Sequence, residues 1–304
     1  MPKKPKKKPL LPLPLRTTPS SKPTKPTKKL PRTATNPTQK ATQHLISHYH
    51  TLNKRLSHCI STNNTTEADS IRAEMEALGG LHAYQKASLK GGNERKGKGA
   101  CGTWVVPFLR AERDRLWGGD SGEDEDDDRK ANSTIQPKAR LRLLDVGAVS
   151  GTTYSHHSTW LHPTYIDLNS QSPLIHKQDF FHRPLPTHPS EKFHILCLSL
   201  VLNFLGDVRQ RGAMLLRAHQ FLLENGLLFI VLPLPCVENS RYMTNERWKG
   251  ILGTVGFDVV EEKMTKRLAM YLCRKCRGRR KGDRWRKEEV RPGKGRNNFC
   301  VVLE

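Results

Sequence analysis

Four residues have the types and the spacing that a nucleoside-binding site requires: Asp145, Gly147, Asp167 and Asp179. Gly147 directly follows a short apolar run, so a ligand could approach bare backbone there. Asp167 stands twenty residues further on, after a second apolar run, where its carboxylate could accept hydrogen bonds from both hydroxyls of a ribose. Asp179 and the neighbouring Phe180 could read and stack an adenine. The alternative is that the three aspartates only cap helices or turns.

Two cofactors, NAD and S-adenosylmethionine, would both use an acid at this spacing. The dinucleotide fingerprint G-x-G-x-x-G is absent, because Gly151 is the only other glycine in the loop that starts at Gly147. A loop with few glycines is poorly suited to cradle a pyrophosphate. S-adenosylmethionine has a ribose and an adenine but no phosphate, so the residues favour it, and NAD remains the alternative.

The elements that would position these residues follow an α/β pattern in residues 140–304. Amphipathic runs at 207–223 and 244–255 predict helices, and fully apolar runs between them predict buried strands. The predicted strands are residues 142–146, 165–168, 193–200, 227–232, 257–261, 268–273 and 299–303. This alternation is typical of a parallel sheet with helices on both faces, whose ligands bind beyond the carboxyl ends of the strands. The crowded last strands predict an antiparallel closing pair, with residues 274–296 as its hairpin insertion.

A small helical unit, residues 41–92, precedes this sheet domain. Its apolar residues recur every three or four positions and predict three helices, the second of them capped by Thr66 and Asp69. A unit of about 50 residues is too small to be stable alone, so we expect it to pack on the sheet domain. The sequence predicts that residues 93–139 are a loop-like linker that contains an acidic, glycine-rich loop. Within this linker, residues 104–109 are expected to form a short strand or to anchor the linker on the sheet domain.

The net charge of +23 is concentrated in two segments. Residues 1–40 hold twelve Lys or Arg, no acid and ten prolines, which predicts a disordered basic tail. Residues 274–296 hold twelve Lys or Arg and three acids. The remainder is therefore nearly neutral, which argues against a fold that clamps nucleic acid over its whole surface. The lysines near the N-terminus are typical of a nuclear or nucleolar address that also contacts RNA phosphates.

Several other classes of protein fit poorly. The longest apolar stretches fall well short of the ~20 residues that span a bilayer, and the N-terminus lacks the apolar core of a secretory signal. Seven cysteines without the spacing of a disulfide framework predict free thiols in a reducing compartment. Cys273 and Cys276 form a C-x-x-C, but no second pair and no histidine follow at zinc spacing. We therefore expect a soluble intracellular protein with no membrane segment and no metal.

Five motif regions along the chain carry a family resemblance. They are GGLHAYQKAS at 79–88, DVGA at 145–148, SLVLNF at 199–204 with RGAML at 211–215, LPLPCVENSRY at 232–242, and NNFC at 297–300. Together they resemble the fungal 25S rRNA adenine-N1 methyltransferase family, nucleolar enzymes with a Rossmann-like class I methyltransferase fold. The resemblance implies S-adenosylmethionine contacts at Gly147 and Asp167, and at Asp179 and Phe180. The sequence departs from the general class I pattern at Val149, where a second glycine is usual.

The SLVLNF motif predicts how a base would be held. Many adenine-N6 and cytosine-N4 methyltransferases carry Asn/Asp-Pro-Pro-Tyr/Phe here to hold an exocyclic amine, whereas N1 of adenine is already nucleophilic through its in-plane lone pair. Catalysis would then be proximity and orientation, and we assign no general base. The candidates for positioning the base are Ser199, Asn203 and, by stacking, Phe204, although these residues could instead be strand-to-helix packing. Arg241 and Tyr242 could form a second wall, by pairing with phosphate and by stacking.

N1 lies on the Watson–Crick edge, so the target adenine must be unpaired or flipped out. The basic insertion 274–296, with Trp285 among its cations, is suited to grip an RNA backbone. The resemblance implies large-subunit rRNA or a pre-ribosomal particle as the partner and the nucleolus of the nucleus as the location; we also expect a monomer. The alternative is a non-catalytic S-adenosylmethionine sensor in growth signalling, like animal relatives of the family. A sensor needs Gly147 and Asp167 equally, but the two basic attachments favour the enzyme.

Overall fold

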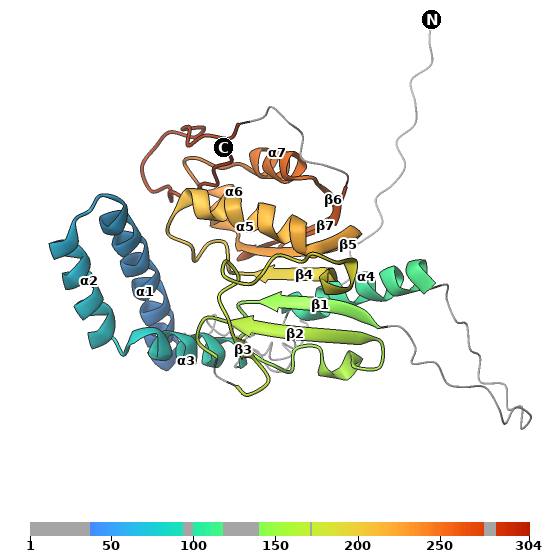
Figure 1. Ribbon diagram of the computed structural model, residues 1–304. Helices are drawn as coiled ribbons and strands as arrows, with labels where there is room; N and C mark the ends of the chain where they lie inside the picture. The colour runs from blue at the N-terminus through green and yellow to red at the C-terminus, as the bar shows by residue number, and fades with distance from the viewer. Residues whose placement is uncertain (1–36, 94–99, 118–139, 171, 277–283) are drawn as a thin grey trace, which may run out of the picture. The chain divides into compact units, whose positions relative to one another are not determined.

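A seven-stranded mixed sheet organises the chain (Figure 1). The computed structural model describes residues 37–93, 100–117, 140–170, 172–276 and 284–304, and residues 37–304 form one compact unit. The strands are β1 (Leu141–Val146), β2 (Leu161–Asp167), β3 (His176–Lys177), β4 (Phe193–Ser199), β5 (Leu222–Pro233), β6 (Phe257–Met264) and β7 (Leu268–Lys275). They pair in the order β3-β2-β1-β4-β5-β7-β6. The first five strands in this order are parallel, and β7 runs antiparallel to both of its neighbours.

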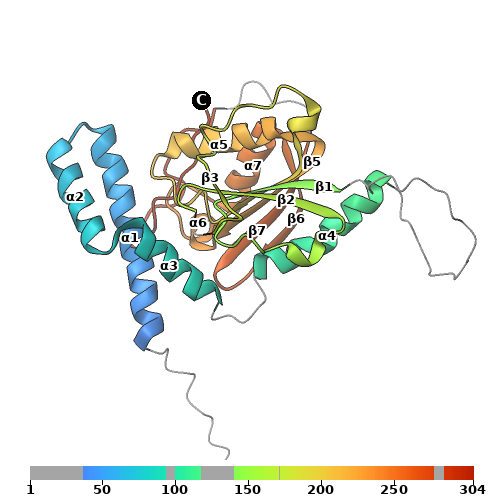
Figure 2. The ribbon, with the colours of Figure 1, turned by 60° about the horizontal axis from the view of Figure 1, so that its bottom comes forward.

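Helices cover both faces of the sheet, as the sequence predicts. α5 (Val208–Phe221) and α7 (Asn245–Val255) lie on one face, and α4 (Ala100–Trp117) lies on the other (Figure 2). Each face has its own buried cluster, with Trp248 of α7 in the first and Leu109 of α4 in the second. Because both faces are covered, the central strands consist almost entirely of buried apolar residues.

The two helices on the first face begin where the sequence predicts. Asp207 caps α5, since its carboxylate accepts a hydrogen bond from the Arg209 amide at 2.8 Å. The Thr244 hydroxyl caps α7 by accepting from the Arg247 amide at 3.1 Å. α7 ends at Gly256, whose φ of 103° is a left-handed conformation that glycine adopts without strain.

Three helices, α1 (Pro37–Ser61), α2 (Thr65–Ala77) and α3 (Gly80–Asn93), form the helical unit that the sequence predicts. Their buried residues make a cluster of their own, composed of Tyr49, Leu52, Cys59, Ala68, Ile71 and Met75. The predicted cap of α2 is wrong. Asn64, and not the threonine two positions later, accepts a hydrogen bond from the Glu67 amide at 3.3 Å, because the residue just before the helix can reach that amide.

Residues 100–117 form neither the loop-like linker nor the short strand that the sequence predicts. They form α4, a helix of 18 residues that contains Pro107. Proline disfavours a helix interior, but burial of Val105 and Leu109 against the sheet outweighs that propensity. The acidic loop predicted at 118–128 lies outside the described residues.

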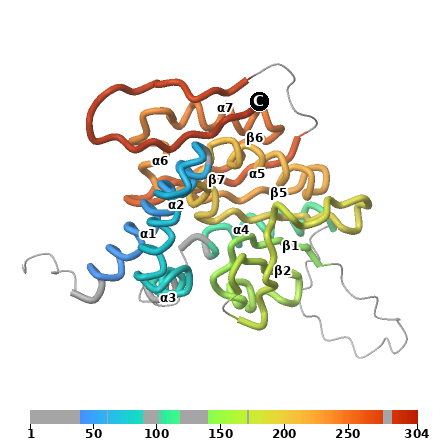
Figure 3. The backbone as a smooth tube through the Cα atoms, turned by 60° about the vertical axis from the view of Figure 1, so that its left-hand side comes forward, coloured from blue at the N-terminus to red at the C-terminus, as the bar shows by residue number. Residues whose placement is uncertain are grey.

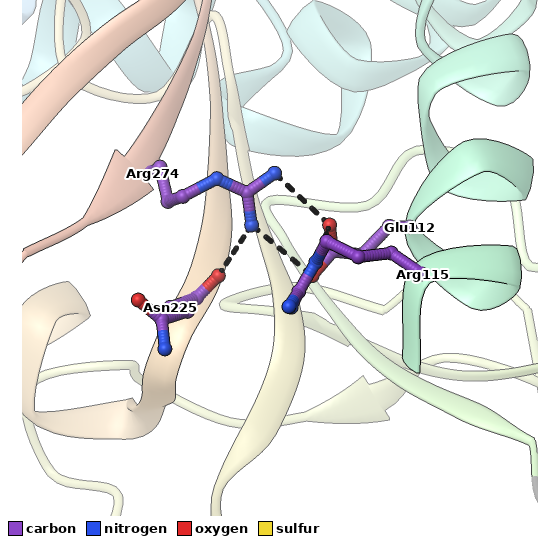
Figure 4. Close-up of polar contacts among 4 residues, drawn as sticks. All are labelled: Glu112, Arg115, Asn225 and Arg274. Atoms are coloured by element: carbon purple, nitrogen blue, oxygen red, sulfur yellow. Dashed lines mark hydrogen bonds and ion pairs between the residues drawn. The ribbon is translucent and has the colours of Figure 1, made fainter. Parts of the chain in front are cut away.

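A buried carboxylate, Glu112, joins α4 to the end of β7 (Figure 4). Arg115 donates to its Oε1 at 2.6 Å, and Arg274 donates to its Oε2 at 3.0 Å. Arg274 also donates to the Asn225 carbonyl at 2.9 Å, so α4, β5 and β7 meet at this cluster. Burial raises the pKa of Glu112, but the hydrogen bonds from the two arginines outweigh burial and hold this pKa below its usual value.

The C-terminal residues 299–303 are buried but do not form the predicted strand. Leu303 makes only an isolated antiparallel bridge with Trp285. The segment packs on α5 instead, where Gly212 makes room for it: a Cβ atom there would lie 2.0 Å from a backbone oxygen of the segment. The predicted pairing of strands 268–273 and 299–303 is therefore wrong, and the closing antiparallel pair is β6 and β7. Residues 277–283 of the predicted insertion lie outside the described residues.

Two further strand boundaries differ from the prediction. β3 was not predicted, because its two residues are polar and exposed and carry no apolar pattern. β5 begins at Leu222, directly after α5 ends at Phe221, whereas the sequence predicts a helix to 223 and a strand from 227.

No helix in the described ranges is long and apolar enough to cross a membrane. Nor do three His, Cys, Asp or Glu side chains gather in those ranges as a metal site would require. Cys59, Cys197, Cys236, Cys273 and Cys300 are free thiols, and burial raises the pKa of Cys236 to about 12.

Candidate cofactor and base-binding site

The carboxyl ends of β1, β2 and β4 lie side by side at one edge of the sheet (Figure 1). In the sheet register, Val146 stands opposite Ile166 on one side and Leu198 on the other. The three strands therefore end at the same level, and the residues after them converge. We call this set the carboxyl edge; it comprises residues 147–151, 167–169 and 199–206.

Gly147 lies at the centre of the carboxyl edge. Its φ of 72° is in the left-handed region that other residues rarely adopt. A Cβ atom there would lie 2.7 Å from Cγ2 of Val201, which belongs to the loop after β4. The missing side chain thus lets the loops after β1 and β4 touch, and the cofactor contact at Gly147 stays a prediction.

Asp167 ends β2 with a half-buried carboxylate. Its Oδ1 accepts hydrogen bonds from the Asn169 amide at 2.8 Å and from Gln85 Nε2 at 2.9 Å. Its Oδ2 accepts none from the described residues. Burial raises the pKa of Asp167, and the two hydrogen bonds oppose that rise without cancelling it. Asp167 thus caps its own turn through one oxygen, and the contact of the other oxygen with a ribose hydroxyl stays a prediction.

Gln85, on α3, is a site residue that sequence reasoning missed. Its Nε2 also donates to the Asn169 carbonyl at 2.9 Å, and its Oε1 accepts from Asn169 Nδ2 at 2.7 Å. The helical unit therefore reaches the carboxyl edge and holds Asp167. Apart from its place in the GGLHAYQKAS motif, the sequence gives no signal for this contact, because 82 residues separate Gln85 from Asp167.

Asp145 and Asp179 occupy different settings. Asp145 is buried within β1, where burial raises its pKa to about 7, so the alternative that it caps a turn is wrong. Asp179 follows β3 and does cap a turn: its Oδ1 accepts from the Phe181 amide at 2.7 Å. Its Oδ2 lies 3.3 Å from His182 Nδ1. Asp179 stays a candidate for reading the adenine.

The predicted stacking role of the Phe180 ring is contradicted by its position. Only 3% of Phe180 is exposed, and its ring centroid lies 5.2 Å from that of Phe221 in the core under α5. Of two consecutive phenylalanines, this one turns inward to fill the space beside α5, and the half-buried Phe181 remains nearer the surface.

The loop after β4 has two unusual features. Leu200 has a φ of 62°, which costs a residue with a side chain roughly 1 kcal/mol or more and is typical of functional sites. The Oδ1 atom of Asn203 is buried and has no hydrogen-bond partner among the described residues. Buried polar atoms are nearly always satisfied, so this oxygen is able to accept a hydrogen bond from a group outside the described residues. Ser199, the last residue of β4, is half-buried beside this loop.

Phe204 does not have the free ring that base stacking would need. Its ring packs among those of Tyr49, His50 and Tyr84, with centroid distances of 6.4, 4.9 and 5.3 Å. Its carbonyl oxygen accepts a hydrogen bond from Asn53 Nδ2 at 3.0 Å. Phe204 therefore anchors the helical unit to the carboxyl edge, which confirms that the unit packs on the sheet domain but corrects the predicted role of this residue.

The guanidinium of Arg241 is bound by residues near the C-terminus, so it is not free to pair with a phosphate. Its guanidinium donates to Asn298 Oδ1 at 2.8 Å and to the Gly293 carbonyl at 3.2 Å. Tyr242 is half-buried, and Lys287 Nζ lies 4.9 Å from the centre of its ring. Arg241 thus holds residues 293–298 in place, and Tyr242 lies beside a cation.

The fold and the carboxyl edge together define a class of protein. The sheet is parallel except for β7, which lies antiparallel between β5 and β6; a glycine follows β1 and an acid ends β2. This is the arrangement of a class I S-adenosylmethionine-dependent methyltransferase. Residues 69–301 match the family described as 25S rRNA (adenine(2142)-N(1))-methyltransferase, Bmt2. The chain belongs to this family, which confirms the resemblance seen in its motifs.

Individual relatives agree with this membership. A 25S rRNA adenine-N(1) methyltransferase of Schizosaccharomyces pombe is 32% identical over 268 residues, which cover 84% of this chain and 89% of the relative. The 25S rRNA (adenine(2142)-N(1))-methyltransferase of Saccharomyces cerevisiae is 30% identical over 235 residues, 77% of this chain and 63% of the relative. This chain thus spans less than two thirds of the budding-yeast protein.

More distant similarities cover less of the chain. The S-adenosylmethionine sensor upstream of mTORC1 of Xenopus tropicalis is 26% identical over 138 residues, 39% of this chain and 34% of the sensor. Among solved structures, a 1,6-didemethyltoxoflavin-N1-methyltransferase of Burkholderia thailandensis covers 45% of this chain and 72% of its own, with 14% identity and a TM-score of 0.36.

Proposed function

We propose that this protein transfers a methyl group from S-adenosylmethionine to N1 of an adenine in large-subunit rRNA. The family to which the chain belongs is named for this reaction. The single observation that carries the proposal is the Oδ1 of Asn203, which has no partner among the described residues and stands at the same edge of the sheet as Gly147 and Asp167. A base-holding acceptor in the loop after β4 and a nucleoside-holding acid at the end of β2 would then lie on the two sides of β1.

The cofactor fits the residues that the carboxyl edge presents. Asp167 would accept a ribose hydroxyl through Oδ2, and Gly147 would allow the cofactor to lie against backbone. Gln85 would fix the Asp167 carboxylate from α3, so that its orientation is set before binding. Bound S-adenosylmethionine supplies an electrophilic methyl group on its sulfonium.

Asn203 would orient the base. An amide oxygen is a suitable acceptor for the exocyclic N6 amino group of adenine, and N6 neighbours N1 on the same edge of the ring. Holding that amino group would direct the N1 lone pair toward the methyl group, which is catalysis by orientation. N1 of adenine carries no proton at neutral pH, so no general base is needed, and the product base carries a positive charge.

The location and the partner are also part of the proposal. N1 must be exposed, so the substrate is an unpaired or flipped adenine in rRNA or in a pre-ribosomal particle. The basic residues at 1–40 and the described cations at 284–296 support a nucleolar, RNA-binding protein by their charge. A monomer stays a prediction.

Methyl transfer by the purified protein tests the proposal. Deproteinised large-subunit rRNA and isotopically labelled S-adenosylmethionine should yield labelled N1-methyladenosine on nucleoside analysis. Asn203→Ala should lower kcat/KM by about 10-fold, the cost of one hydrogen bond of about 1.4 kcal/mol, and leave cofactor affinity unchanged. A labelled N6-methyladenosine product, or no product at all, would refute the proposal; the second result would favour a cofactor sensor.

A further inference from the structure

A groove of about 1100 Å³ is lined by residues of α1, of the start of α5 and of the C-terminal segment, residues 284–304. Figure 3 shows the course of the backbone through these three parts of the chain. Its lining carries five cations: Lys54, Arg209, Arg284, Arg286 and Lys287. Pockets for small molecules measure ~300–1,000 Å³ and are mostly apolar. The size and the charge of this cavity, here called the basic groove, suit a polyanion instead.

The acids of the basic groove are already engaged. Asp207 caps α5 by accepting from the Arg209 amide at 2.8 Å, and Glu304 lies 2.9 Å from the Arg209 guanidinium. The other four cations of the groove form no ion pair with any residue in the described part of the chain. An anionic ligand would therefore meet uncompensated positive charge.

The basic groove leads into the loop that would hold the base. Gly206, which lines the groove, closes that loop, and α1 packs on it so closely that a Cβ atom there would lie 1.9 Å from Ser57 Oγ. Asn53, the neighbour of Lys54, donates to the Phe204 carbonyl at 3.0 Å. Burial, and then the charge of Arg211 below the loop, lower the pKa of Lys54, in keeping with its position next to these residues.

The chemistry of the groove matches a nucleic acid strand better than an acidic protein. Proteins that bind single-stranded nucleic acid combine cations along the backbone with aromatic rings on which bases stack. Here the half-buried Tyr242 ring lies under the ammonium of Lys287, 4.9 Å away. The cations of the groove thus adjoin an aromatic ring through Lys287 and the base-holding loop through Gly206.

We propose that the basic groove binds the phosphate backbone of the RNA strand that carries the target adenine. Lys54 on α1 contacts it from one wall, and Arg286 and Lys287 on the C-terminal segment contact it from the other. This inference rests on the proposed function, since it names where the substrate of that reaction lies.

The salt dependence of RNA binding tests the groove directly. The probe is a fluorescently labelled single-stranded RNA of about 12 nucleotides with one adenine, titrated with the full chain at several KCl concentrations. Each phosphate contact contributes about 0.7 to the slope of log K against log salt for single strands. The variant with Lys54→Gln, Arg286→Gln and Lys287→Gln should lose about 2 from that slope, and should bind about 10- to 100-fold more weakly.

A matched control removes the same charge elsewhere. Arg110, Arg140 and Lys192 lie on α4 or just before β1 and β4, away from the carboxyl edge, and none of them lines the groove. Their triple substitution by Gln should leave the slope within about 0.5 of the wild type, since it removes no phosphate contact. Thermal unfolding and cofactor affinity, measured for both variants, should match those of the wild type.

The outcomes separate the groove from the proposed function. An equal loss of salt slope in both triple variants, or an unchanged salt slope in the groove variant, would overturn the proposal that the groove binds RNA. This holds even if the wild-type protein methylates rRNA. If the groove variant keeps the salt slope of RNA binding but no longer binds poly-glutamate, the groove binds an acidic protein partner, and this result would also overturn the proposal that it binds RNA. Failure of the wild type to methylate rRNA would refute the proposed function instead, and is read in a separate assay.

Discussion

Asp167 carries the most specific residue-level expectation of the carboxyl edge. Asp167→Asn removes the charge that a ribose hydroxyl would contact while preserving the size of the side chain. The loss of a charge-assisted hydrogen bond costs roughly 1.5–3 kcal/mol, so S-adenosylmethionine should bind about 10- to 150-fold more weakly in calorimetry. Asp258→Asn is the control, because Asp258 is an exposed acid on β6, at the opposite end of the sheet order. Equal affinity for both variants would contradict the assignment of Asp167.

The sequence placed Gly147 and Asp167 correctly because both end apolar runs, and parallel strands end at one edge. It could not choose between Phe180 and Phe181, since only packing against α5 decides which ring turns inward. The contact between Gln85 and Asp167 was equally beyond reach, because it depends on how α3 docks.

At the scale of elements, α4 shows how tertiary packing overrides local signals. Glycines and a proline near its apolar residues indicate a loop, but burial of one apolar face and of Glu112 on the sheet makes this segment a helix. The C-terminal segment shows the converse: residues 299–303 have the pattern of a buried strand, yet they are buried by packing on α5 instead.

Glu112 should make α4 a measurable contributor to stability. Glu112→Gln leaves Arg274 and Arg115 without their carboxylate. Both arginines are partly exposed, so solvent screens the charges left behind, and the cost should be about 1–3 kcal/mol, below that of a fully buried pair. Asp114→Asn, which breaks the exposed pair with Arg113, should cost about 0–1 kcal/mol. Urea unfolding of the two variants would measure both values, and equal costs would contradict a stabilising role for the cluster.

The same cluster predicts a pH dependence. The pKa of Glu112 is lower in the folded protein than its usual value, so the folded state binds this proton less tightly than the unfolded chain does. The stabilisation by ionised Glu112 is fully present above about pH 4.5, and it is lost as the pH falls through the lower pKa that Glu112 has in the folded protein. The difference in unfolding free energy between wild type and Glu112→Gln should therefore shrink below that pH.

At the scale of the whole molecule, the charge divides the chain into a nearly neutral body and basic attachments. Deleting residues 1–36, which precede α1, should leave the thermal transition and cofactor affinity unchanged, because the seven strands and the carboxyl edge are built from residues 141–275. The truncated protein, followed by fluorescence microscopy, should leave the nucleolus. Retention there would place the address elsewhere, most simply in the basic residues 274–296.

Primer extension on large-subunit rRNA tests the central claim, that this protein makes N1-methyladenine, most directly. A methyl group on N1 blocks Watson–Crick pairing, so reverse transcriptase should stop or misread at one adenine in cells that hold the wild-type protein. Gly147→Arg places a long side chain where even a Cβ atom would lie 2.7 Å from Val201, and the signal should vanish in cells that hold this variant. Uninterrupted read-through at every adenine in both strains would contradict the claim.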